Sequence, residues 1–208
     1  MLLAPEQFFA FISAAVLITL SPGPDNLMVL SIGATRGRLR GMAFGMGCAL
    51  GCLSHTLLAT LGVSALIAAS PVAFTALKII GGLYLIYLGW LALKSRGGAT
   101  VATNSSQENA GKLFWRGVFA NSINPKVVMF FLAFLPQFVD GARHDAGWQI
   151  LQLGIIFTLQ AMLLFGTLGF FAGYIGRYLN QHAAASAWLD RIAGSIFIAL
   201  GLRLIIHP

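Results

Sequence analysis

The sequence is dominated by long apolar stretches that short polar or charged segments separate. Hydrophobic residues make up 58% of the 208 residues and charged residues only 9%, whereas about one quarter is charged in a typical soluble domain. A helix needs about 20 apolar residues to cross the roughly 30 Å hydrocarbon core of a bilayer, and several stretches reach that length. The pattern therefore predicts an all-α integral membrane protein.

Six transmembrane helices are predicted from long apolar runs that end at charge, glycine or proline. They cover residues 8–32, 41–66, 72–93, 114–139, 148–174 and 188–206. Prolines interrupt the first run at residues 22–24 and the fourth near residue 125. Residues 95–111 have the composition of a polar linker, so the chain is expected to divide into a unit of residues 1–94, this linker, and a unit of residues 112–208.

Basic residues near the span ends predict the orientation, because cytoplasmic loops carry the excess of Lys and Arg. Nine lie on one side: Arg36, Arg38, Arg40, Lys94, Arg96, Lys112, Arg116, Arg177 and Arg191. Three lie on the other: Lys78, Arg143 and Arg203. The linker is therefore predicted to be cytoplasmic and both termini periplasmic.

No basic segment precedes the first span, so a cleaved signal peptide is not expected. The net charge of +7 is scattered, which argues against a nucleic-acid partner.

The two units resemble each other in sequence. Residues 78–85 align without gaps with residues 191–198, and residues 21–25 align with residues 122–126, so that the proline breaks correspond. Three spans in each unit place the second copy upside down relative to the first, as in transporters with inverted repeats. The alternative is that apolar helices share glycine and aromatic residues by chance.

The breaks predict a polar site inside the membrane. Proline ends a helix, and backbone released at membrane depth is tolerated only where protein or water satisfies it. Asp25 follows the first break, and Lys126 follows Asn124 and Pro125 at the second, with Asn121 one turn earlier. Intramembrane charge costs at least about 2.5 kcal/mol. The two residues are therefore expected to form a salt bridge, to bind the ammonium and carboxylate of a zwitterionic substrate, or to snorkel into solvent.

Other polar residues within the spans give weaker indications. His55 is a candidate proton relay or a neutral hydrogen-bonding group, and Gln160 is a candidate cavity-lining residue. Cys48 and Cys52 lie one helical turn apart without metal-ligand partners, so they are expected to be packing residues. No cofactor or metal is expected. The HExxH, GxSxG and P-loop signatures of enzymes and nucleotide-driven pumps are missing.

The motifs at the two breaks resemble those of the LysE/RhtB family of bacterial amino-acid exporters, of the homoserine, threonine and lysine efflux type. The first motif comprises Ser21, Pro22, Gly23, Pro24, Asp25 and Asn26. The second is residues 121–126 (NSINPK), and residues 78–89 are similar to the family's third helix. The resemblance implies a secondary transporter of the bacterial inner membrane that exports amino acids or close derivatives by antiport against protons, with both motifs binding substrate or ions. Its partners would be the substrate and the lipid bilayer, and a homodimer is left open.

Two other classes of membrane protein compete with this interpretation. A passive channel would conduct small solutes without stoichiometric proton coupling. A membrane thiol-disulfide electron carrier also fits six helices and prolines, but it needs one cysteine near each break, and both cysteines lie in the second span. A structural scaffold gives no reason for two charged helix breaks.

Overall fold

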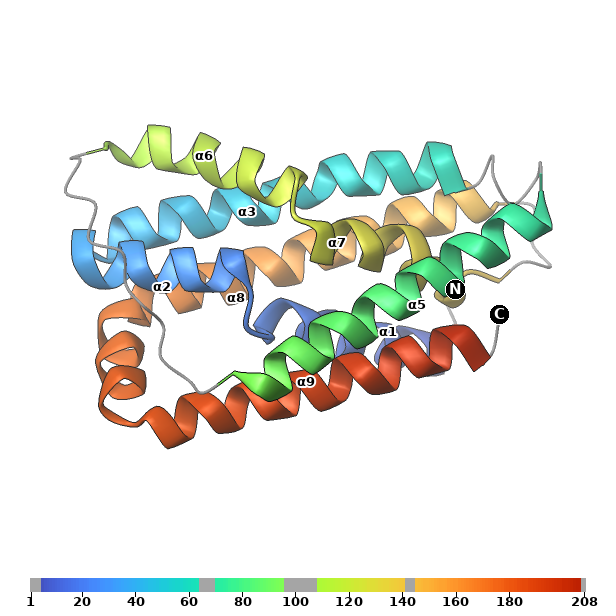
Figure 1. Ribbon diagram of the computed structural model, residues 1–208. Helices are drawn as coiled ribbons and strands as arrows, with labels where there is room; N and C mark the ends of the chain where they lie inside the picture. The colour runs from blue at the N-terminus through green and yellow to red at the C-terminus, as the bar shows by residue number, and fades with distance from the viewer. Residues whose placement is uncertain (1–4, 64–69, 96–107, 141–144, 207–208) are drawn as a thin grey trace.

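The computed structural model describes residues 5–63, 70–95, 108–140 and 145–206, and Figure 1 shows them as a bundle of long helices. Every regular element in these ranges is helical. Three helices are long and apolar enough to cross a membrane: α3 (Arg38–Leu58), α5 (Pro71–Lys94) and α8 (Ala146–Gln181). The helical structure and these apolar helices are consistent with the all-α membrane class predicted from composition.

The first and fourth predicted spans are each a bent pair of helices. α1 (Pro5–Leu20) and α2 (Pro24–Arg36) are bent by 56° relative to each other. α6 (Ala110–Ser122) is bent by 49° relative to the segment Pro125–Phe138, which begins with α7 (Pro125–Met129). Both bends fall at the predicted prolines. α7 continues as a π-helix, η2 (Phe130–Phe134), and a 3₁₀-helix, η3 (Leu135–Phe138). Mid-helix π segments often mark functional sites, and here η2 lies directly after the second break.

The described residues contain up to five spans if each bent pair is one, and the sixth stays a prediction. α9 (Ala183–Ile206) covers the predicted run at residues 188–206, but Asp190, Arg191 and Arg203 lie on it, and length and composition do not identify it as a span. The second span continues from α3 into a π-helix, η1 (Ala59–Val63), and its predicted end at residues 64–66 lies outside the described residues. Most of the predicted linker, residues 96–107, also lies outside them.

α3 forms the centre of the larger group of helices. It packs against α8, α6 and α2, whereas α5 packs mainly against α9. Glycines allow these close contacts: a Cβ on Gly41 would lie 2.6 Å from the Cα of Gly33, and a Cβ on Gly89 would meet the main chain of Gly194. Because lipid supplies no hydrophobic force between helices, small residues of this kind let backbones approach and gain dispersion contacts.

The direction of the chain alternates through the bundle (Figure 1). α3 and α8 run in opposite directions, as do α5 and α9. The start of α1 and the end of α9 lie at one end of the bundle, whereas the end of α5 and the start of α6 lie at the other.

Candidate functional site

The two helix breaks exchange hydrogen bonds. Oδ2 of Asp25, in the first turn of α2, accepts from the side-chain amides of Asn121 (2.8 Å) and Asn124 (2.9 Å). In the opposite direction, Nζ of Lys126, in the first turn of α7, donates to the carbonyl of Ser21 (2.9 Å) and to its Oγ (3.1 Å). Each charged side chain therefore reaches the break of the other helix pair.

The two half-helices begin in the same way. Pro24 starts α2 after Gly23, and Pro125 starts α7 after Asn124. Proline is favoured at a first helical position because the missing N–H would have no intrahelical acceptor there. The side chain of Asn124 also accepts from the main-chain N of Lys126 at 3.0 Å, which caps α7. This local chemistry places the charge of each motif at the second helical position.

Asp25 and Lys126 do not contact each other. The ion pairs that join two described residues all involve Glu108, and none joins Asp25 to Lys126. The direct salt bridge considered from the sequence is therefore wrong: amide donors bind Oδ2 of the carboxylate, and the ammonium reaches across to Ser21. Snorkelling is wrong as well, since Asp25 is 4% exposed and Lys126 is 6% exposed.

The remaining residues of the first motif fix the break. Asn26 donates from Nδ2 to the carbonyl of Thr19 at 2.8 Å, which ties α2 back to the last turn of α1. Its Oδ1 is buried and has no partner. Ser21 donates from Oγ to the carbonyl of Ile18 at 2.7 Å. Gly23 leaves room for the lysine, because a Cβ there would lie 2.9 Å from Nζ of Lys126. Pro22 lies in the break itself, between the helices.

His55 and Gln160 lie around the site without lining its pocket. Nε2 of His55 is 2.9 Å from the main-chain carbonyl of Asn121. A carbonyl only accepts, so Nε2 carries the proton, and Nδ1 is left buried without a partner. Gln160 donates to Oγ1 of Thr19 at 2.8 Å, and its Oε1 has no partner. These contacts are compatible with either role considered for His55.

A pocket lies between the breaks and α8. Its polar lining consists of Thr19, Asp25, Asn26, Asn121 and Lys126. Its apolar lining consists of Ile18, Cys52, Val127, Phe130, Phe157 and Phe165. The free space suffices for about one water molecule, so this conformation is contracted around the charges.

Sequence reasoning missed most of the pocket wall. Phe130, Phe157 and Phe165 have the pattern of ordinary core residues, and only the fold brings the two on α8, Phe157 and Phe165, to the breaks. Thr19 carried a signal, because it is a hydroxyl two residues before the break in an apolar run. Cys52 lines the pocket with its thiol 3.5 Å from Oδ1 of Asn121. Within the described ranges no group of His, Cys, Asp and Glu is arranged to hold a metal ion.

A bundle of apolar helices with opposite charges buried at two helix breaks is the architecture of a membrane transporter. The chain belongs to the LysE type translocator family, which it matches over residues 16–207. This membership indicates a transporter of the amino-acid exporter type rather than an enzyme.

Relatives over nearly the full length support the same class. The chain is 32% identical to an uncharacterized membrane protein of Vibrio cholerae, over 95% of each chain. It is 28% identical to a leucine efflux protein of an Enterobacter species, over 95% of this chain and 94% of the relative. It is 29% identical to a homoserine/homoserine lactone efflux protein of Salmonella typhi, over 96% of each. No solved structure matches the chain.

Proposed function

We propose that the protein is a secondary active transporter that exports amino acids or close derivatives across the bacterial inner membrane in exchange for protons. The observation that carries this proposal is the pairing of Asp25 and Lys126 in one buried pocket without direct contact. Two hydrogen bonds reach Oδ2 of Asp25, and none among the described residues engages Oδ1. Lys126 has three donor hydrogens and two hydrogen bonds. One acceptor and one donor therefore remain for the ammonium and carboxylate of a substrate.

Asp25 is also the proposed proton carrier. A carboxylate can bind either a proton or the ammonium group of a substrate, but not both at once. This competition couples proton movement to substrate movement, which is the simplest basis for antiport. His55 is the second candidate, because its free Nδ1 can accept a proton and its Nε2 contacts Asn121. Proton release from one side of the membrane would then make Asp25 available to the substrate.

The proposed architecture is a pair of inverted three-helix repeats, residues 1–94 and 112–208, joined by the cytoplasmic linker 95–111. The opposite directions of α3 and α8 and of α5 and α9 support it (Figure 1), as do the matching starts of α2 and α7. In this arrangement both termini are periplasmic, and alternating access results from movement of one repeat relative to the other. A homodimer is compatible with it.

Both competing classes fit the site less well. A passive channel needs a continuous aqueous path, whereas this pocket has room for about one water molecule. A thiol-disulfide carrier needs one cysteine at each break, whereas Cys48 and Cys52 are both on α3, buried and unpaired.

The proposal is tested with purified protein in proteoliposomes loaded with labelled amino acids. An imposed proton gradient should accelerate efflux of at least one of them, and that efflux should move protons in the opposite direction with fixed stoichiometry. An efflux rate that does not depend on the proton gradient would indicate a channel. Absence of efflux for every amino acid and derivative tested would contradict the exporter assignment.

A further inference from the structure

Among the described residues, Asp25 and Lys126 are the only charged side chains that line the pocket, one of each sign. The other polar lining groups are two amides and one hydroxyl, and the rest of the wall is apolar. Phe157 is central to that wall, with its ring centroid 5.2 Å from Phe130 and 4.9 Å from Phe131. Phe157 and Phe165 lie on α8, opposite the two breaks.

These groups limit which side chain a substrate can carry. A zwitterionic amino acid uses Asp25 for its ammonium and Lys126 for its carboxylate, so no lining charge remains for its side chain. A cationic or anionic side chain would lose its hydration against phenyl rings without a compensating partner, which is costly. An apolar side chain would instead bury its surface against the same rings.

We infer that the substrates are amino acids with uncharged, apolar side chains, and that Phe157 contacts the side chain and sets its size. This inference rests on the proposed function. Because the pocket is contracted, the substrate-bound form must be wider. The added space would lie on the phenylalanine side, since the breaks are fixed by hydrogen bonds.

A panel of labelled amino acids in the same proteoliposomes tests the substrate class. Leucine, methionine and phenylalanine should leave roughly thirtyfold faster or more than lysine, arginine and glutamate at equal concentration. Faster efflux of a charged amino acid would overturn the inference while leaving the exporter assignment intact. Efflux of none of these six would also overturn the inference, whereas the exporter assignment is contradicted only if every other amino acid and derivative tested fails as well.

The variant Phe157→Leu tests the contact directly. The smaller side chain should raise the ratio of phenylalanine efflux to leucine efflux by roughly tenfold. Phe119→Leu is the matched control, because Phe119 is 68% exposed on the outside of α6, and it should leave the ratio unchanged. An unchanged ratio in Phe157→Leu, or failure to distinguish it from the control, would remove Phe157 from the substrate site.

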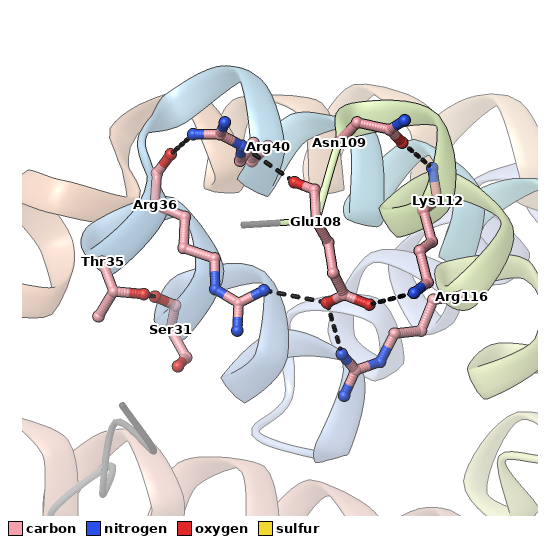
Figure 2. A network of polar contacts seen from close by, with 8 residues as sticks. All are labelled: Ser31, Thr35, Arg36, Arg40, Glu108, Asn109, Lys112 and Arg116. Carbon is pink, nitrogen blue, oxygen red and sulfur yellow. Dashed lines mark hydrogen bonds and ion pairs between the residues drawn. The ribbon is translucent and has the colours of Figure 1, made fainter. Parts of the chain in front are cut away.

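A separate observation concerns the end of the bundle where α2 ends and α6 begins. Figure 2 shows Glu108 surrounded by basic residues there. Its Oε2 accepts from Arg36 and Arg116, each at 3.0 Å, and Lys112 lies 3.8 Å from Oε1. The main-chain carbonyl of Glu108 accepts from Nε of Arg40 at 3.2 Å. The side chain of Glu108 is only 12% exposed and that of Arg36 14%.

This cluster and the site both connect α2 with α6. α2 begins with Asp25 in its first turn and ends at Arg36, while α6 follows Glu108 and ends just after Asn121. The two connections, Asp25 to Asn121 and Arg36 to Glu108, are separated by about 16 Å of helix. Between them α2 packs mainly on α3 and α8, and α6 mainly on α3. Polar contacts at the two ends therefore hold α2 against α6.

We propose that Glu108 is a latch that keeps the pocket closed on the linker side. Access from that side requires the Arg36 end of α2 to separate from the start of α6, which breaks the ion pair of Glu108 with Arg36. Because transport needs this access to be transient, the latch would open once in each cycle. This second inference also rests on the proposed function.

The native thiol of Cys52 reports on the latch, because Cys52 lines the pocket and is 1% exposed. In a Cys48→Ala background, an impermeant maleimide is applied from each side of membrane vesicles. Glu108→Gln keeps the shape but removes the charge, and it should speed labelling from the linker side by about fivefold. Glu6→Gln, at an exposed position in α1, is the control and should change nothing.

Equal labelling rates in Glu108→Gln and the parent would overturn the latch. Arg36→Gln breaks the same ion pair from α2 and should reproduce the faster labelling if Glu108→Gln does not assemble in the membrane. The readout needs no transported amino acid. A negative result therefore removes the latch without affecting the exporter assignment, which the proteoliposome assay tests separately.

Discussion

The side-chain amide of Asn121 donates a hydrogen bond to Oδ2 of Asp25 at 2.8 Å, from one helix break to the other. An amide hydrogen-bonds a carboxylate without cancelling its charge, so this contact leaves the carboxylate able to attract a cation. A direct ion pair with Lys126 would have satisfied both residues and left little for a ligand. The protein instead uses neutral groups as partners for both charges.

Asp25→Asn should abolish transport while the protein still folds. The asparagine is nearly isosteric and can accept from one amide, but it has no charge for an ammonium or a proton. We expect efflux to fall at least about a hundredfold, with normal membrane abundance and a thermal midpoint within a few degrees of the parent. Glu6→Gln serves as the control for losing a carboxylate elsewhere.

The exchange Asp25→Lys with Lys126→Asp separates recognition from pairing. The two residues do not contact each other, so the exchanged pair cannot restore a salt bridge that the parent lacks. The amides of Asn121 and Asn124 would also face an ammonium group instead of a carboxylate. The double variant should therefore be inactive. Efflux at near the parent rate in this variant or in Asp25→Asn would contradict the assigned role of Asp25.

Gly23→Ala should impair transport by displacing the ammonium of Lys126. The backbone at Gly23 is extended, with φ −177° and ψ 174°, which alanine also adopts. The new Cβ would lie 2.9 Å from Nζ of Lys126, so the flexible lysine must move away from Ser21. We expect a roughly tenfold lower efflux rate.

A double-mutant cycle checks this explanation for Gly23. In a Lys126→Met background, Gly23→Ala should lower the thermal midpoint in detergent much less than it does in the parent, because the methionine has no ammonium to displace. An equal effect in both backgrounds would show that the alanine acts through the backbone or another neighbour.

Gly47→Ala should destabilise the contact of α3 with α6. A Cβ at Gly47 would meet the main-chain carbonyl of Phe114 well inside van der Waals distance. Backbone cannot move aside as a side chain can, so we expect a loss of roughly 1 to 3 kcal/mol. Gly173→Ala in α8 is the control, because nothing lies within 4 Å of its Cβ position. That variant should be neutral or slightly more stable in thermal unfolding.

The sequence predicts the breaks better than it predicts the site around them. Prolines at residues 22, 24 and 125 act locally, so their positions in the chain sufficed to place both bends. The partners of Asp25 and Lys126 depend instead on how α2 and α7 approach each other. Opposite charges in matching positions suggested a salt bridge, whereas the fold places each charge against the polar groups of the other break.

Two further features could not be read from the chain. Phe130 follows the second break in η2, whereas Phe157 and Phe165 lie far along the chain, and only the packing of α8 brings them to the breaks. α8 has 36 residues, about 54 Å of helix, so it extends beyond the predicted span at residues 148–174. Apolarity ends near residue 174, but helical hydrogen bonding continues into the polar residues that follow.

Reporter fusions test the proposed orientation. A fusion after Pro208 should be active only as a periplasmic reporter, and one within residues 95–111 only as a cytoplasmic reporter. The excess of basic residues near the linker is the physical reason, because cytoplasmic loops retain Lys and Arg. Finding both reporters active on the same side would remove the inverted repeat, since the three spans proposed for the second unit put the linker and the C-terminus on opposite sides of the membrane.

The last prediction concerns the pH dependence of the Glu108 latch. The pKa of the Glu108 carboxyl is lowered from its ordinary value of 4.5, first by the hydrogen bond from Arg36 and further by the nearby charges of Arg116 and Lys112. A carboxyl whose pKa is lower in the folded protein stabilises the fold at all pH values above about 4.5. That stabilisation is lost as pH falls through the lowered pKa, because the folded carboxyl then takes up its proton.

The difference in thermal midpoint between the parent and Glu108→Gln should therefore stay constant from roughly pH 6 to pH 8 and shrink only below about pH 4.5. Thermal unfolding of both proteins in detergent, from below about pH 4.5 to pH 8, measures this difference. A difference that instead disappears between pH 6 and pH 8 would mean that another titrating group, and not Glu108, holds α2 against α6.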